Sequence, residues 1–203
     1  AHFADDLDGD KIPDPWENRF VADPADLDPG YDGDRDGRDA WNEFLADSNP
    51  LLHTLTLDEG WNCAGMGAPP VDESPGTVFG SEGRGGNATV TLPAWEWRGA
   101  AHRAATRIQC LRGYWIMAAA GLAEFAVSDA PAPVSLELRP GWNLVCLPTG
   151  AAGGSPPDVF GDKARLPVWR WGDGLFTRVA TVEPRVAIWV FSPAGGTVDL
   201  PME

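Results

Sequence analysis

The sequence contains two copies of one segment, and this duplication constrains the fold more than any other feature. Residues 55–62 (LTLDEGWN) recur 81 positions later at 136–143 (LELRPGWN), and residues 78–80 (VFG) recur at the same displacement. Residues 92–97 (LPAWEW) and 114–116 (YWI) recur 74 positions later, as LPVWRW and IWV. The change from 81 to 74 places a seven-residue insertion in the first copy, at residues 81–87. Four anchors in the same order indicate an internal repeat.

Each copy has the pattern of about six short strands. In the second copy they lie near 134–139, 142–147, 167–171, 175–181, 186–191 and 197–200, where β-branched and aromatic residues gather. Pro140-Gly141 predicts a type II turn between the first two strands. No long amphipathic helix is evident. A copy of about 70 residues is marginally stable alone, so we expect the copies to share an interface.

The predicted fold is therefore mainly β, with two tandem homologous antiparallel units that are sandwich-like or barrel-like. We expect the first unit at residues 51–130 and the second at 131–203. Residues 1–50 form a separate acidic segment, which holds 15 Asp and Glu against 4 Lys and Arg, a net charge of −11 out of −15 for the chain. Carboxylates at this density repel one another unless a cation neutralises them. This segment is predicted to be a small loop-helix unit that binds two calcium ions.

Two 12-residue stretches of the acidic segment match a calcium loop whose ligands come from positions 1, 3, 5, 7, 9 and 12. Counting from Asp6 fills every position, whereas counting from Asp32 places Ala40, which has no side-chain oxygen, at position 9. A Gly normally makes the sharp turn at position 6; Gly37 is there in the second loop, but Lys11 replaces it in the first. The predicted metal ligands are Asp6, Asp8, Asp10, the Ile12 carbonyl, Asp14, Glu17, Asp32, Asp34, Asp36, the Arg38 carbonyl and Glu43.

Each loop runs into a short helical pattern that ends before an Asp-Pro or Asn-Pro pair. Trp16, Phe20, Trp41 and Phe44 are expected to face inward, packing the loops against each other or against the next domain. The remaining carboxylates of the segment rank below the loop positions as ligands. The alternative to calcium loops is an acidic, solvated linker, which the regular spacing of the carboxylates disfavours.

The run Asp-x-Asp-x-Asp-x-Ile-Pro-Asp-x-Trp-Glu, followed by Asp-Pro and a second Asp-x-Asp-x-Asp-Gly loop, resembles thrombospondin type 3 repeats of bacterial secreted proteins. Its loops are also similar to those of EF-hands and dockerins. The resemblance covers about a quarter of the chain and implies a calcium-binding, extracellular, structural segment. Dockerins usually carry Asp at position 12 and lie at C-termini, so Glu17, Glu43 and the N-terminal location argue against a cohesin partner. The duplicated Gly-Trp-Asn … Trp-x-Trp unit is similar to repeats beside such segments in bacterial surface proteins.

The pairs Trp95/Trp97 and Trp169/Trp171 have two interpretations. Side chains two residues apart lie on one face of a strand. Recurrence in both copies favours a core position, while the alternative is an aromatic platform for sugar rings. Cys63 and Cys110 fall in one copy, where either a disulfide or free thiols would fit. Cys146 is expected to be a buried thiol.

Several functional classes are disfavoured. No basic stripe suits nucleic acid, and no apolar run is long enough to insert in a membrane. His2, His53 and His102 are scattered, and no hydrolase, zinc-protease or phosphate-loop motif occurs, so we expect no enzymatic activity. The chain begins at Ala1 without a signal peptide, which suggests either a secreted chain whose signal has been removed or a fragment.

These observations predict an extracellular or cell-surface protein that is stabilised by calcium and has a structural or interaction role. A self-assembling filament or surface-layer subunit is one such role, with other copies of itself or another surface protein as partner. The alternative is a carbohydrate-binding module that binds glycan through the Trp pairs.

Overall fold

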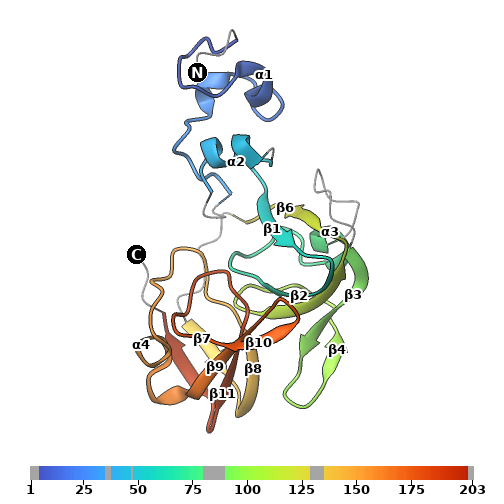
Figure 1. Ribbon diagram of the computed structural model, residues 1–203, viewed down its shortest axis with the longest axis vertical. Helices are drawn as coiled ribbons and strands as arrows, with labels where there is room; N and C mark the ends of the chain where they lie inside the picture. Colours follow the sequence, from blue (N-terminus) through green and yellow to red (C-terminus); the bar gives the residue numbers. More distant parts are fainter. Residues whose placement is uncertain (1–4, 35–37, 47, 80–89, 129–134, 201–203) are drawn as a thin grey trace.

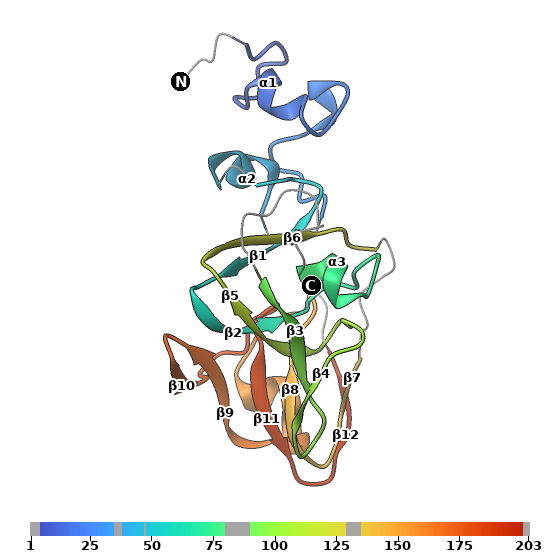
Figure 2. The ribbon, with the colours of Figure 1, turned by 90° about the vertical axis from the view of Figure 1, so that its right-hand side faces the viewer.

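The computed structural model describes residues 5–34, 38–46, 48–79, 90–128 and 135–200. The fold is mainly β, with antiparallel sheets in two similar groups, as the sequence predicts. Figures 1 and 2 show the N-terminal segment at one end of the molecule, with α2 between α1 and the β units. The predicted insertion at 81–87 and the predicted unit boundary at 130/131 lie outside the described residues.

The two units have the same order of elements and the same strand pairing. The first contains β1 (His53–Leu57), β2 (Gly60–Gly65), α3 (Pro75–Phe79), β3 (Val90–Trp97), β4 (His102–Ala104), β5 (Gly113–Ala118) and β6 (Gly121–Phe125). The second contains β7 (Ser135–Leu138), β8 (Gly141–Val145), α4 (Pro156–Phe160), η2 (Gly161–Lys163), β9 (Arg165–Gly172), β10 (Leu175–Arg178), β11 (Ile188–Ser192) and β12 (Gly196–Asp199).

In each unit the first and last strands pair, as β1-β6 and β7-β12, and the other four form sheets β2-β5-β3-β4 and β8-β11-β9-β10. The six strands predicted for the second copy correspond to β7–β12. Helices α3 and α4, which lie at the Val-Phe-Gly anchor and are each five residues long, are additional to the predicted strands.

The Gly-Trp-Asn anchor stabilises the turn between the first two strands of each unit. Gly60 and Gly141 have φ values of +100° and +95°, a region that glycine adopts without steric cost. The Asn143 side chain accepts a hydrogen bond from the Arg139 nitrogen (2.9 Å) and donates to the carbonyls of Arg139 (2.8 Å) and Gly141 (3.0 Å). Asn62 makes the same three bonds in the first unit. The anchor therefore has a structural role in both copies.

One face of each four-stranded sheet forms the core of its own unit. The two-stranded sheet and the helix supply apolar side chains to it, as Leu55, Phe79 and Ile116 illustrate in the first unit. The matching positions of the second unit form its core in the same way. Because side chains alternate along a strand, the neighbours of these core residues point to the opposite face of the sheet.

That opposite face is also apolar and meets the other unit. Trp115 on β5 and Trp189 on β11 belong to one cluster with Leu144 and Ala187. The contacts are reciprocal: Trp97 Nε1 donates to the Trp142 carbonyl at 2.7 Å, and its counterpart Trp171 Nε1 donates to the Trp61 carbonyl at 3.1 Å. The copies thus share an interface, as expected for units with two apolar sheet faces.

The N-terminal segment contains α1 (Asp14–Glu17), η1 (Pro24–Asp26) and α2 (Ala40–Ala46). Its own core consists of Ile12, Trp16, Leu27 and Ala40, with Phe20, Val21, Trp41 and Phe44 packed against them. The Trp16 ring lies 4.9 Å from that of Phe20 and 5.5 Å from that of Phe44. The four aromatic residues therefore face inward and pack the two loop regions against each other, one of the two arrangements that the sequence suggested.

Candidate functional site

The first predicted calcium loop brings all five of its carboxylate residues together. One oxygen each from Asp6, Asp8 and Asp14 lie within 4.8 Å of one another, and so do oxygens from Asp8, Asp10 and Glu17. Asp8 belongs to both groups, so the five carboxylates form one continuous cluster. These are the residues at positions 1, 3, 5, 9 and 12 of the loop, and Ile12 at position 7 has a fully buried side chain.

Backbone hydrogen bonds hold these side chains in place while leaving other oxygens available. Asp6, Asp10 and Asp14 accept from the backbone nitrogens of Gly9 (2.8 Å), Ile12 (2.7 Å) and Leu7 (2.8 Å). Short polar side chains at every second residue favour such turns over helix or strand. The loop is therefore shaped by the same carboxylates that converge in it.

Glu17 is the most constrained member of the cluster. Its side chain is fully buried, and neither of its carboxylate oxygens accepts a hydrogen bond from a described residue. Burial, followed by the charges of Asp10, Asp8 and other loop carboxylates, raises its pKa to about 7. Burial and neighbouring carboxylates also raise the pKa of Asp10. An ionised carboxylate is costly to bury without a partner, so the arrangement favours a bound cation.

Lys11 makes the turn for which calcium loops normally use glycine. Its φ is +86°, in the left-handed region, and Gly9 two residues earlier has φ of +81°. A side chain with a Cβ pays roughly 1–2 kcal/mol in this region. The departure that the sequence shows at position 6 is thus accommodated by backbone strain.

Lys11→Gly is expected to stabilise the calcium-loaded protein by about 1 kcal/mol, because glycine adopts a positive φ without the Cβ clash. Thermal unfolding in excess calcium would measure this. Lys11→Ala is the matched control, since it removes the same charge but keeps the Cβ and the strain. Equal stability of the two variants would mean that charge, rather than backbone conformation, governs position 11.

The second predicted loop is described only in part, because Asp36 lies outside the described residues. Asp34 and Glu43 are buried (1% and 0% exposed), and Asp32 is half-buried. Glu43 lies in α2 and its Oε1 accepts from Ser48 Oγ at 3.5 Å, while the Arg38 side chain donates to Thr56 Oγ1 at 3.3 Å. Among the described residues, these positions do not form a group of three converging ligand atoms.

The spare carboxylates of the segment serve turns. Asp23 caps η1 by accepting from the Ala25 nitrogen at 3.2 Å, and Asp28 accepts from the Gly30 nitrogen at 2.8 Å. Asp39, at the start of α2, accepts from the Asn42 nitrogen at 2.9 Å. Their lower rank as ligands agrees with these local roles.

The remaining candidates from the sequence have mixed outcomes. Cys63, Cys110 and Cys146 are free thiols, so Cys63 and Cys110 are not paired, and Cys146 is fully buried as expected. His53 is fully buried at the start of β1, where burial and then the Arg185 charge lower its pKa to about 3. His102 is exposed on β4, and His2 lies outside the described residues. No helix of the described chain is long and apolar enough to cross a membrane.

The Trp pairs lie at the interface between the units rather than in the interior of either one. Trp95, Trp97, Trp169 and Trp171 are all half-buried. The Trp97 ring packs 5.2 Å from Trp189, and the Trp171 ring packs 5.1 Å from Trp115, each across the interface. The rings therefore pack at the interface instead of in either unit's core, and they keep accessible surface.

Comparison of the chain with family models, with curated proteins and with solved structures found no match.

Proposed function

We propose that the N-terminal segment is a calcium-binding brace in an extracellular protein with a structural or interaction role. The observation that carries this proposal is Glu17, a fully buried carboxylate with neither oxygen hydrogen-bonded to a described residue, which converges with Asp8 and Asp10 in the carboxylate cluster. A cation in this cluster would supply the missing partner and offset the mutual repulsion of the carboxylates.

The ligand set favours calcium over other common cations. Every candidate ligand is an oxygen, which hard cations prefer, and calcium accepts six to eight of them in flexible geometry. Magnesium demands near-ideal octahedral geometry and usually keeps several waters, which suits one or two carboxylates rather than five. A second ion in the loop from Asp32 to Glu43 is part of the proposal, supported by the burial of Asp34 and Glu43.

A bracing role is supported by how the segment contacts the first β unit. The Trp16 and Phe44 rings join the first loop to α2. Beyond α2, the Asn49 nitrogen donates to Glu124 Oε1 on β6 at 3.2 Å, and Arg38 reaches Thr56 on β1. A cation that fixes the first loop would therefore also restrain α2, and through these contacts the β1-β6 pair. Weak sites of this kind, with Kd of about 10⁻⁴–10⁻³ M, suit the high calcium outside cells.

Calcium titration of the whole chain tests the brace. In 10 mM calcium each bound ion is expected to raise the unfolding free energy above that in EDTA by about 1.4–2.7 kcal/mol, which follows from a ligand present at 10–100 times its Kd. Magnesium at the same concentration is expected to have a smaller effect. Identical unfolding in calcium and in EDTA would contradict the assignment.

For the structural role, we favour self-assembly of the chain through its β units. β10 lies at the edge of its sheet and exposes Leu175 (65%) and Phe176 (50%). An exposed apolar edge strand is a template for pairing with another chain. Negative-stain microscopy in calcium is expected to reveal ordered polymers that Leu175→Lys removes, with Asp173→Lys in the adjacent exposed turn as the control. Absence of polymers from the unaltered chain would leave the calcium brace standing but exclude the filament.

A further inference from the structure

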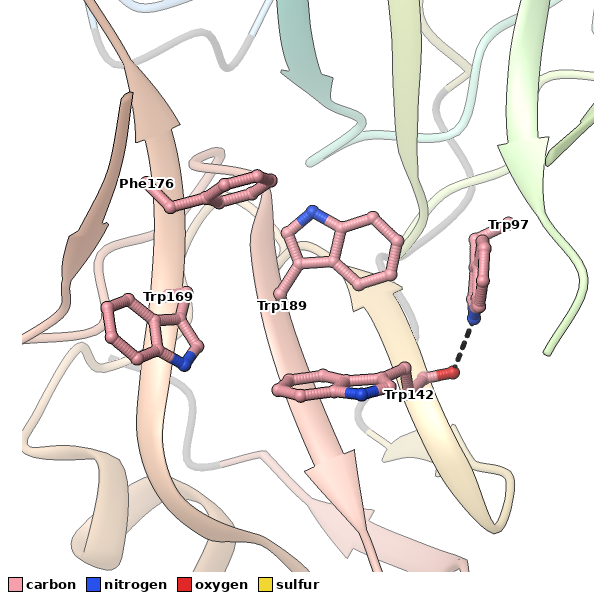
Figure 3. Close-up of a pocket in the computed structure, with 5 residues that line it drawn as sticks. All are labelled: Trp97, Trp142, Trp169, Phe176 and Trp189. Carbon is pink, nitrogen blue, oxygen red and sulfur yellow. Dashed lines mark hydrogen bonds between the residues drawn. The ribbon is translucent and has the colours of Figure 1, made fainter. Parts of the chain in front are cut away.

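Two pockets of matching composition lie on the interface between the β units. The Trp189 pocket is lined by Trp97, Trp142, Trp169, Phe176 and Trp189 and has a volume of about 390 Å³ (Figure 3). The Trp115 pocket is lined by Trp61, Trp95, His102, Trp115 and Trp171 and has a volume of about 330 Å³. Each Trp of one pocket is the repeat counterpart of a Trp in the other, and His102 on β4 corresponds to Phe176 on β10.

The rings stand at steep angles to one another, so their faces bound a common space. Trp189 lies at 72° to Trp97 and at 78° to Trp142. Figure 3 shows Trp97 and Trp142 edge-on, while the face of Trp189 is turned toward the viewer. In the other pocket, Trp115 lies at 77° to Trp61 and at 66° to Trp171. Flat stacking platforms would instead present parallel faces.

The lining offers aromatic faces and few hydrogen-bonding groups. Neither pocket is lined by Lys, Arg, Asp or Glu among the described residues, and the Nε1 groups of Trp97 and Trp171 are already bonded to backbone carbonyls. Trp115 Nε1 and Trp189 Nε1 are buried and have no acceptor among the described residues. A sugar carries several hydroxyl groups, whereas neither lining includes a carboxylate, amide or hydroxyl side chain that could bond to them.

We propose that each pocket binds a quaternary ammonium group. Such a cation has no N–H to satisfy, and its charge is attracted to the negative faces of several aromatic rings at once, as in aromatic cages. The outermost rings are open to ligand, since Trp61 is 48% and Trp142 39% exposed. Residues 51–203, which contain both β units, carry a net charge of −4, which attracts cations.

Neighbouring charges distinguish the two pockets. Three arginines and one glutamate line a small adjoining pocket that shares Trp97 with the Trp189 pocket. Glu96 pairs with Arg98 at 2.6 Å, so the charge of this pocket stays positive through Arg112 and Arg139. No corresponding arginine cluster lines the Trp115 pocket among the described residues. Positive charge close to a bound cation weakens its attraction, so the Trp115 pocket is expected to bind choline more tightly. The proposal is independent of the calcium brace, because the pockets are formed by the β units alone.

The test uses choline and its neutral isostere, 3,3-dimethylbutan-1-ol, with NMR of the indole N–H groups of the ¹⁵N-labelled whole chain. The chain has ten Trp residues, and Trp16 and Trp41 of the N-terminal segment are internal controls. Choline is expected to shift the Trp115 and Trp189 signals at concentrations roughly tenfold or more below those required for the neutral alcohol, and to leave Trp16 and Trp41 unmoved. Cellotetraose is titrated in the same way, to test whether the pockets bind a sugar.

Trp142→Leu and Trp61→Leu assign the sites, because each removes one exposed wall but keeps the backbone carbonyl that accepts the indole hydrogen bond. Trp142→Leu is expected to abolish the choline response of Trp189 and to preserve that of Trp115, with the reverse for Trp61→Leu. Equal responses to choline and to the neutral alcohol would overturn the proposal, as would a response to cellotetraose alone. Pocket signals that none of the three probes shifts would overturn it as well.

Discussion

Glu17→Gln is expected to abolish most of the stability that calcium contributes through the first loop, and to leave the calcium-free protein as stable as before or more stable. In calcium, the variant loses a charged ligand with two oxygens, so most of the gain of about 1.4–2.7 kcal/mol at 10 mM calcium should disappear. In EDTA, the neutral amide escapes the repulsion that Asp8 and Asp10 exert on a buried carboxylate. Thermal unfolding of the unaltered protein and of Glu17→Gln, each in calcium and in EDTA, measures both effects.

A variant that loses stability in calcium but not in EDTA distinguishes a metal ligand from an ordinary buried side chain. Asp26→Asn is the matched control, because Asp26 is an exposed carboxylate of the same segment that lies outside the converging cluster. It is expected to change stability by less than about 0.5 kcal/mol in either buffer, as exposed substitutions usually do. If Glu17→Gln destabilised the protein equally in calcium and in EDTA, the cation site would be excluded.

Gly65→Val is expected to cost about 3 kcal/mol or more and to lower the melting temperature by about 6–12 °C. Gly65 ends β2, in contact with the second unit. A Cβ there would overlap the Arg185 carbonyl oxygen and lie 2.7 Å from Cys146 Sγ and 2.8 Å from the Ala187 nitrogen. Two of these three obstacles are backbone atoms of the second unit, so a rotamer change cannot relieve the clash.

Gly172→Ala is the control for this prediction, because a Cβ at Gly172 meets no atom within 4 Å. It is expected to leave the melting temperature nearly unchanged. Trp fluorescence gives a second readout, since loosening of the interface would expose the rings of Trp115 and Trp189 to water. A Gly65→Val protein with the stability and fluorescence of the control would show that the units do not pack through this face.

The strand content was predictable because duplication and alternation are local signals. The GWN, Trp-x-Trp and YWI anchors mark strands at the same places in both copies, and a period of two distinguishes the two faces of each strand. The helices α3 and α4 were missed because five residues show less than two turns of helical periodicity. The role of Asn62 and Asn143 was also missed, although the recurrence of Asn after Gly-Trp is a signal for a turn bonded by a side chain.

The convergence of the carboxylates in the first loop was predictable to the level of individual residues. Ligand spacing in a calcium loop is a property of a short continuous segment, so Asp6, Asp8, Asp10, Asp14 and Glu17 are recognisable without tertiary information. The burial of Glu17 was not predictable in the same way. It depends on the packing of Trp16 against Phe20 and Phe44, which come from different turns of the segment.

The sequence by itself determined the repeat, which is visible in the order of the residues alone, and the strands and the first loop, which depend on residues close together in the chain. Tertiary structure alone decided the surroundings of the Trp pairs. Trp97 bonds to the backbone at Trp142, and Trp171 to the backbone at Trp61, 110 positions away. Contacts between different strands of two units leave no trace in local spacing. The four Trp residues of these pairs therefore became parts of two aromatic pockets only when the second apolar face of each sheet packed against the other unit.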